Sequence, residues 1–344
     1  MSRVWYNGEK EWKDLIMGEY IGRINVSKDT MLFIVNTVLK KGIKENTTKE
    51  NILKMIPEIY EKADSVELIK MLPYKTYIAL QDLRKYIKTS SDIKEFFYHS
   101  EHQDVRCLEE AMIIIMRAKH MEYNYSLNPG VIDKLNKIFS DENKKIANRY
   151  GRIEALTKGM LYLYGVVEFD FLRTQICKHM NEIITEDELR DLYFKRLNLN
   201  LDVNYYNVRW TNTNEVQQFV TYLDEEYEDV GYIVDEQKSR GLKYKIFKEK
   251  EILNREEYLW DKSTQNLYKY INSKSNDVWK YTFKTIIKRN ELGENILQQL
   301  IEKCKFEKEE EIDEFIRVFM EWYNNSPQYV LGGYSPIEFG KMRV

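Results

Sequence analysis

Apolar residues recur along most of the chain at the spacing of helices with one buried face. In residues 29–42, DTMLFIVNTVLKKG, apolar side chains fall three and four positions apart, and Gly42 follows where a C-terminal cap belongs. The pattern continues through residues 77–87. Residues 109–121, EEAMIIIMRAKHM, are apolar almost all the way round and predict a buried central helix. The first part of the chain is therefore predicted to be helical.

Short polar residues followed by acids indicate where further helices begin. Thr47 with Glu50, and Asp64 with Glu67, have the capping-box spacing, in which two side chains satisfy each other's exposed backbone N–H groups. The chain has only five prolines and fourteen glycines, whereas an all-β fold needs many tight turns. Helices are therefore expected to dominate.

The middle of the chain has a different pattern. A short β-like run that begins at residue 166 is followed by two helices, the second opened by Thr185 with Glu188, and residues 213–227 predict an extra helix. Residues 230–247, VGYIVDEQKSRGLKYKIF, place two alternating runs around a turn, which predicts a β-hairpin. Together these elements predict a winged-helix-like unit, with a mixed α+β domain as the alternative.

We therefore expect a mainly α, multi-helical protein with a central winged-helix-like α+β unit. The turn formers of residues 126–131, SLNPGV, mark the best early boundary. The predicted units are a helical N-terminal unit at residues 1–125, a winged-helix-like unit with a basic hairpin at 126–250 and a helical C-terminal unit at 251–344.

Composition indicates a folded cytoplasmic protein. Of the 344 residues 43% are hydrophobic, enough for a sizeable core, and the three cysteines are far apart, as expected of free thiols in a reducing compartment. The first residues lack the pattern of a signal peptide, and no apolar run has the length that a bilayer demands, so we expect no membrane contact. Abundant Lys, Asn, Ile and Tyr are typical of a low-GC bacterium, its phages or its mobile elements.

Local groups of basic residues form the candidate nucleic-acid-binding site. The formal net charge is −3, which gives no global attraction to phosphate, so any such binding has to be local. Within residues 278–290, VWKYTFKTIIKRN, lysines four apart form one helical stripe, although such a stripe is also typical of a solvated helix face. More basic residues surround the expected hairpin turn. The candidates are Lys238, Arg240, Lys243 and Lys245 at the hairpin, with Lys248 and Lys250 beyond it, and Lys280, Lys284, Lys288 and Arg289 on the stripe.

The helix that would enter a DNA groove is acidic. Its first turn carries Glu186, Asp187 and Glu188, and Asp191 follows. These charges disfavour a groove lined by phosphates. The winged-helix-like unit is therefore expected to contact protein, or to touch DNA only through its wing.

Few groupings have the spacing of a catalytic or metal site. His99, His102 and Cys107 lie close in sequence with Glu101 and Asp104 between them, but a structural zinc site needs a fourth ligand from Cys177 or His179. Cys177 with His179, and Glu168 with Asp170, are weaker pairs that a helix explains without chemistry. We expect no metal, no cofactor and no enzyme activity.

The most distinctive phrase is MEWYNNSPQYVLGGYSPIEF at residues 320–339. It predicts a helix with an apolar face ending at Asn325, a compact turn, and a second helix with Ser335 as N-cap, Pro336 in the first turn and Glu338 as the capping acid. Residues 323–339 resemble the C-terminal tail of insertion-sequence transposases of the retroviral-integrase fold. Those enzymes need an acidic triad on the strands of an RNase H-like sheet, and the sequence upstream predicts no such strands.

Over residues 150–340 the chain also resembles poorly characterised bacterial proteins that carry a zinc-binding SEC-C motif. In these proteins a Tyr-Gly-Val segment, like residues 164–166 here, precedes an Asn-Asn, Pro, Gly, Pro, Glu phrase like the one at residues 324–338. The resemblance implies an intracellular interaction protein and names no reaction. Residues 1–344 contain no Cys-rich zinc module, so no role of that module is carried over.

The sequence thus favours a non-enzymatic, intracellular binding or regulatory protein that acts through protein contacts. One alternative is a DNA-binding regulator that contacts phosphates through the basic stripe and the wing. A metal-dependent enzyme built on His99, Glu101 and His102 is the least favoured alternative. The identity of the partner and the oligomeric state are left open.

Overall fold

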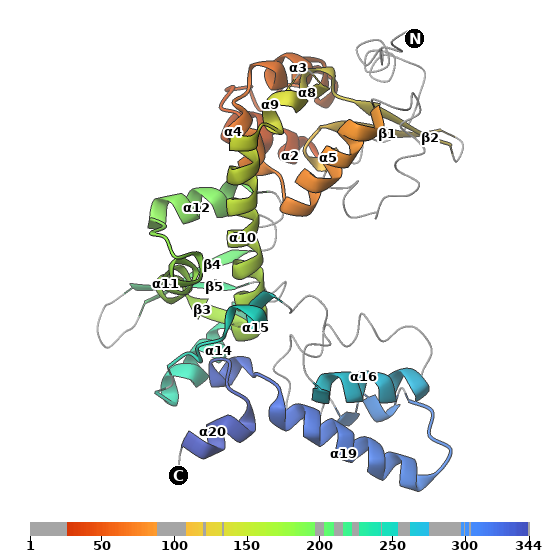
Figure 1. Cartoon of the computed structure of the whole chain (residues 1–344), viewed down its shortest axis with the longest axis vertical. Helices are drawn as coiled ribbons and strands as arrows, with labels where there is room; N and C mark the ends of the chain where they lie inside the picture. The colour runs from red at the N-terminus through yellow and green to blue at the C-terminus, as the bar shows by residue number, and fades with distance from the viewer. Residues whose placement is uncertain are drawn as a thin grey trace. The chain divides into compact units, whose positions relative to one another are not determined.

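The chain is mainly helical and contains two small antiparallel sheets (Figure 1). The computed structural model describes residues 26–87, 108–119, 122–132, 134–196, 203–209, 216–221, 227–241, 243–253, 262–274, 297–298, 300–302 and 304–342. The chain forms two compact units: unit 1 comprises Met1–Glu154 and Thr185–Leu201, and unit 2 comprises Ala155–Ile184 and Asp202–Val344. Both are discontinuous in sequence. The division into three consecutive units at residues 125 and 250 stays a prediction.

Unit 1 is a group of helices with one β-hairpin. Its main helices bury one apolar face each; that of α3 buries Ile52, Leu53, Ile56, Ile59 and Tyr60. The short helix α8 approaches α3 so closely that a Cβ atom on Gly130 would lie 1.9 Å from the Pro57 carbonyl oxygen. The described helices are α2 (Lys28–Leu32), continued by the π-helix η1 (Phe33–Val38), α3 (Lys49–Lys62), α4 (Ser65–Met71), α5 (Tyr74–Ile87), α8 (Pro129–Ile132), α9 (Leu135–Ile138), residues 141–154 of α10 (Asp141–Tyr164) and α12 (Glu186–Lys195).

Helix starts in unit 1 follow the predicted caps with one shift. The Asp64 carboxylate accepts the Val66 N–H at 2.9 Å, and the Thr185 hydroxyl accepts the Glu188 N–H at 3.1 Å, as the sequence predicts. The cap of α3 is Thr48 rather than Thr47, and its hydroxyl accepts the Asn51 N–H.

The predicted central helix at residues 109–121 is wrong. Its second half is strand β1 (Ile114–Lys119), which pairs antiparallel with β2 (Glu122–Leu127), so that Ile114 lies opposite Leu127. Consecutive isoleucines at 113–115 favour a strand, because β-branched side chains fit a pleated surface better than a helix. A nearly continuous apolar run does not separate the two structures by its period.

Unit 2 contains a three-stranded sheet with helices beside it. The strand order is β3-β5-β4, and both pairings are antiparallel. The predicted helix at residues 213–227 is wrong over Val216–Thr221, which forms β5. The elements are β3 (Val166–Glu168), α11 (Phe169–Met180), β4 (Asn204–Arg209), β5 (Val216–Thr221), α14 (Tyr227–Ser239), α15 (Glu249–Leu253), α16 (Lys262–Lys274), α19 (Glu309–Asn325), the 3-10 helix η3 (Tyr329–Leu331) and α20 (Pro336–Met342).

The predicted hairpin at residues 230–247 is also wrong. Residues 227–239 form α14, which buries Val230, Ile233 and Val234, and Gly241 follows with a φ of 61°. Those buried positions fit the period of a helix, and the positive φ of Gly241 ends it. Residues 243–248 have no regular secondary structure. The winged-helix arrangement is therefore not confirmed.

The C-terminal phrase folds as predicted. In α19 the side chains of Phe315, Phe319 and Trp322 pack with Leu267 and Ile271 of α16, and the two helices lie side by side (Figure 1). After the turn at η3, α20 begins with the predicted capping box. The Ser335 N–H donates to Glu338 Oε2 at 3.0 Å, and the Glu338 N–H donates to Ser335 Oγ at 3.4 Å.

Membrane-spanning helices are absent from the described part of the chain, where none of the helices combines the required length with sufficient apolar character.

Candidate functional site

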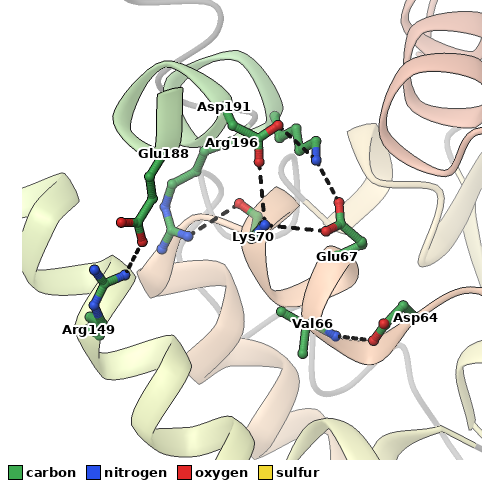
Figure 2. A network of polar contacts seen from close by, with 9 residues as sticks. Asp64, Val66, Glu67, Lys70, Arg149, Glu188, Asp191 and Arg196 are labelled. Atoms are coloured by element: carbon green, nitrogen blue, oxygen red, sulfur yellow. Dashed lines mark hydrogen bonds and ion pairs between the residues drawn. The ribbon is translucent and has the colours of Figure 1, made fainter. Parts of the chain in front are cut away.

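Unit 1 contains a network of ion pairs between α4 and α12, drawn in Figure 2. Lys195 Nζ lies 2.8 Å from Glu67 Oε2 and 2.8 Å from Asp191 Oδ1. Lys70 Nζ approaches the other oxygen atoms of the same two carboxylates, at 3.3 and 3.4 Å. Two lysines and two carboxylates thus form a closed ring in which each charge has two partners of opposite sign.

A second part of the network is deeply buried. The Arg196 side chain is 1% exposed, and its Nε lies 2.6 Å from Glu154 Oε2 on α10. The same carboxylate oxygen accepts the Tyr74 N–H at 3.0 Å. Arg196 Nη1 donates to the carbonyl oxygens of Ile69 and Lys70, both at 3.4 Å, at the C-terminal end of α4. One guanidinium therefore ties the end of α12 to α10 and α4.

The electrostatics of the ring are those of stable ion pairs. Partial burial raises the pKa of Asp191, but hydrogen bonds and charge from Lys195 and Lys70 outweigh it, so this pKa lies below its usual value. Burial likewise opposes the charge of Lys195, yet its bonds to Asp191 and Glu67 raise its pKa overall. The charged forms are thus favoured on both sides.

The network has the character of a clamp rather than of a catalytic centre. Each of its acids and bases has at least one partner of opposite charge. Arg149 of α10 likewise lies 2.6 Å from Glu188 of α12 (Figure 2). A general acid or base needs a pKa shifted toward the working pH, whereas these pairs shift the pKa of Asp191 and Lys195 away from it. The acids Glu188 and Asp191 of α12, which the sequence predicts to disfavour a DNA groove, hold α12 to α10 and α4.

Several predicted nucleic-acid-binding residues are engaged within unit 2. Lys238 Nζ lies 2.5 Å from Gln217 Oε1, and Arg240 forms an ion pair with Glu236 at 2.5 Å. Lys245 Nζ lies 2.6 Å from Glu338 Oε1. The remaining hairpin candidate, Lys243, is exposed and has no ion pair among the described residues, as is also true of Lys248 and Lys250. The stripe of Lys280, Lys284, Lys288 and Arg289 lies outside the described residues.

Aromatic rings in unit 2 gather around Tyr164, at the end of α10. Its ring meets Phe171, Tyr244 and Phe247 edge-on, with centroids 5.7, 5.5 and 5.5 Å away. Its hydroxyl donates to the Lys245 carbonyl oxygen at 2.5 Å. Burial raises the pKa of the Tyr164 and Tyr244 hydroxyls, which therefore stay protonated as hydrogen-bond donors.

The Gln237 side chain completes this aromatic hub. Its Oε1 accepts the Tyr244 hydroxyl at 3.2 Å, and its Nε2 donates to the Tyr329 carbonyl oxygen at 2.7 Å. Gly165, with a φ of 66°, lies so near Tyr329 that a Cβ atom would come within 2.3 Å of the ring. The tail segment is thus fixed to α10 and α14 by directed contacts.

The thiol and metal candidates of the sequence give no site in the described residues. The Cys177 sulfur accepts the Ile184 N–H at 3.3 Å, as a structural group at the end of α11. Glu168 is the N-cap residue of α11, and Asp170 lies in its first turn. Among the described residues no cluster of three or more His, Cys, Asp or Glu side chains could hold a metal ion. His99, Glu101, His102, Asp104 and Cys107 lie outside them.

Unit 2 has two exposed surfaces, of which the sequence predicts only the lysines of the second. Helix α20 contains Ile337, Phe339 and Met342, yet none of its residues is buried; Ile337 is 41% and Met342 50% exposed. In residues 243–253 every exposed side chain is basic or apolar, namely those of Lys243, Ile246, Lys248, Lys250 and Leu253. The sequence alone does not show that the apolar side chains of α20 are exposed, because their burial depends on which elements of the fold pack against this helix.

No protein-family model, curated protein or solved structure matches the chain significantly. The two resemblances of the sequence therefore stay predictions.

Proposed function

We propose that this protein is a non-enzymatic, intracellular binding or regulatory protein, and that it contacts a partner protein through α20. The observation that supports this most is the exposure of α20. Its apolar side chains Ile337 and Met342 are exposed, although the helix has a complete capping box. A helix that is fixed in place and still presents apolar side chains is suited to an apolar groove of another protein.

Polar and cation–π contacts help to hold α20 in place. Glu338 bridges to Lys245 at 2.6 and 2.8 Å, and the Arg240 guanidinium lies 5.8 Å from the centre of the Phe339 ring. These contacts leave Ile337 available and set its direction. A preorganised helix loses little conformational entropy on binding, which favours affinity.

A photo-crosslinking residue at position 337 tests the proposal in a bacterial extract, with the same residue at the exposed Met55 of unit 1 as the matched control. We expect an adduct of one defined mass from position 337 and none from position 55. The partner protein in the adduct is then identified, purified without crosslinking and titrated against the wild type and against Ile337→Lys. A loss of at least about tenfold in affinity supports α20 as the contact, since a buried charge at an interface is strongly unfavourable. Equal affinities would overturn it.

The DNA-binding alternative stays a prediction that the same preparations can address. Fluorescence anisotropy with duplex and single-stranded DNA over a salt series would show tight, salt-sensitive binding if phosphate contacts dominate. Internal pairing of Lys238, Arg240 and Lys245 weighs against it, because each pair would have to be broken or shared on binding.

A further inference from the structure

The exposed face of α19 is acidic around one apolar side chain. Each of the exposed positions Glu310, Asp313, Glu314, Arg317, Met320 and Glu321 has another of them three or four residues away, so they lie on one face of the helix. Glu314 lies 3.6 Å from Arg317, its only basic neighbour on this face. The opposite face of α19 packs on α16 through Phe315 and Phe319. We name the exposed residues the acidic face.

The segment at residues 243–253 is complementary to this face. Its exposed side chains are the lysines at 243, 248 and 250, with Ile246 and Leu253 between and beside them. Ile246 is 52% exposed. We name this set the basic surface. An apolar centre with a charged rim is the usual composition of a protein interface, and here the two rims have opposite sign.

From this complementarity we propose that the chain binds a second copy of itself, with the basic surface of one copy on the acidic face of α19 of the other. The contact is heterologous, since different surfaces meet, so a pair of copies keeps one free acidic face on one copy and one free basic surface on the other. The apolar residues Ile246 and Met320 supply the buried centre. This inference goes beyond the proposed function, and its residues do not overlap with α20.

A second copy fits these surfaces better than nucleic acid does. The basic surface carries the exposed apolar side chains of Ile246 and Leu253 beside the lysines, and a phosphate backbone offers them no apolar partner, whereas the acidic face includes Met320. The chain itself supplies the acidic counterpart on a helix of 17 residues. Because opposite charges attract only within the screening distance, about 10 Å at 0.1 M salt, the association has to weaken as salt is added.

Analytical ultracentrifugation of the full chain at low and high salt tests the proposal. The basic surface is reversed in Lys243→Glu/Lys248→Glu/Lys250→Glu, and the acidic face in Glu310→Lys/Asp313→Lys/Glu321→Lys. We expect the wild type to associate at low salt and each variant alone to be monomeric. When the two variants are mixed, association returns, because each restores a surface of opposite sign for the other.

The matched control reverses exposed lysines of unit 1 in Lys41→Glu/Lys44→Glu/Lys54→Glu, which changes net charge as much as the first variant does. It should associate like the wild type, and circular dichroism melting verifies that every variant is folded. A monomeric wild type at low salt, association unaffected by either reversal, or a mixture that stays monomeric would overturn the proposal. Association that disappears after nuclease treatment would also overturn it and would assign the lysines to phosphate. Failure of the crosslinking at position 337 would overturn the proposed function of α20 but not this self-association, because the two proposals use different residues.

Discussion

Each of the two units is stabilised internally by a different kind of contact. In unit 1, α12 is fixed by ion pairs that include a guanidinium only 1% exposed, whereas unit 2 is centred on the aromatic hub of Tyr164, Phe171, Tyr244 and Phe247. A buried ion pair is costly to break because the remaining charge has no solvent. In an aromatic hub each ring pair contributes a modest free energy, so the loss of one pair leaves the others in place. Unit 1 should therefore be sensitive to single changes of charge, and unit 2 to changes of shape.

The comparison also explains where exposed apolar surface can persist. Most exposed large apolar side chains among the described residues belong to unit 2, including Ile183, Val216, Tyr232 and Met342. Directed contacts such as the bond from Gln237 to Tyr329 fix the backbone of unit 2 without covering these side chains. This arrangement suits a unit that presents surfaces, while the clamp of unit 1 suits a scaffold.

The largest expected effect is the loss of the buried guanidinium in unit 1. Arg196→Ala leaves the Glu154 carboxylate buried without its cation, which should destabilise the protein by about 3–5 kcal/mol. The matched change in unit 2, Tyr244→Phe, removes the hydrogen bond to Gln237 and the one accepted from the Glu168 N–H, and should cost about 1–3 kcal/mol. Urea unfolding measures both. Equal losses in the two variants would contradict the difference between clamp and hub.

Adding one methyl group at a glycine compares the packing of the two units. In Gly130→Ala the new Cβ atom would overlap the Pro57 backbone, so unit 1 should lose about 1–3 kcal/mol. In Gly231→Ala, on α14 of unit 2, the Cβ atom meets no other atom within 4 Å, and the higher helix propensity of alanine should stabilise the protein by up to about 1 kcal/mol. Thermal melting of the two variants should move in opposite directions; a shared direction would show that Gly130 can relax.

The sequence predicts local helix geometry in this chain far better than it predicts strands. The caps at Asp64, Thr185 and Ser335 and the corner of the tail follow from side chains that satisfy nearby N–H groups, so a few neighbouring residues determine them. The sequence predicts a helix at β1 because an apolar run has no readable period, and it predicts a hairpin at α14 because Gly241 also fits a turn. Whether these segments form a strand or a helix depends on residues far away in the sequence that pack against them.

The candidate site was even less accessible to sequence reasoning. Nothing in the pattern distinguishes Lys243, which is exposed, from Lys245, which pairs with Glu338 far along the chain. The same holds for Arg196 and Glu154, whose contact needs the fold to exist. Charge counts along a segment therefore indicate where basic residues are, but not which of them are available to a partner.

A change of pH should affect the acids of the two units in opposite ways. The folded-state pKa of Asp191 lies below its usual value of 3.8, so its contribution to stability is present above that pH and is lost as the pH falls through the folded pKa. Asp191→Asn should thus be less stable than the wild type at neutral pH, and the difference should vanish in acid. Hydrogen exchange of α12 peptides between pH 5 and pH 2, roughly the window of these pKa values, follows this directly. A difference independent of pH would contradict the ion-pair account.

The smallest and most discriminating effect concerns Glu168 in unit 2. Burial raises its pKa above the usual 4.5 despite the charge of Lys238 and a hydrogen bond from Gln217, so the folded state favours the protonated acid. Its contribution is complete below the unfolded pKa and is lost as the pH rises through the folded value, the reverse of Asp191. Glu168→Gln should therefore gain stability relative to the wild type between acid and neutral pH. Carboxyl titration by NMR checks the pKa itself. A value below 4.5 would mean that the attraction of Lys238 and Gln217 exceeds the effect of burial. The pKa of Glu168 would then be lowered like that of Asp191, and the two units would not differ in this respect.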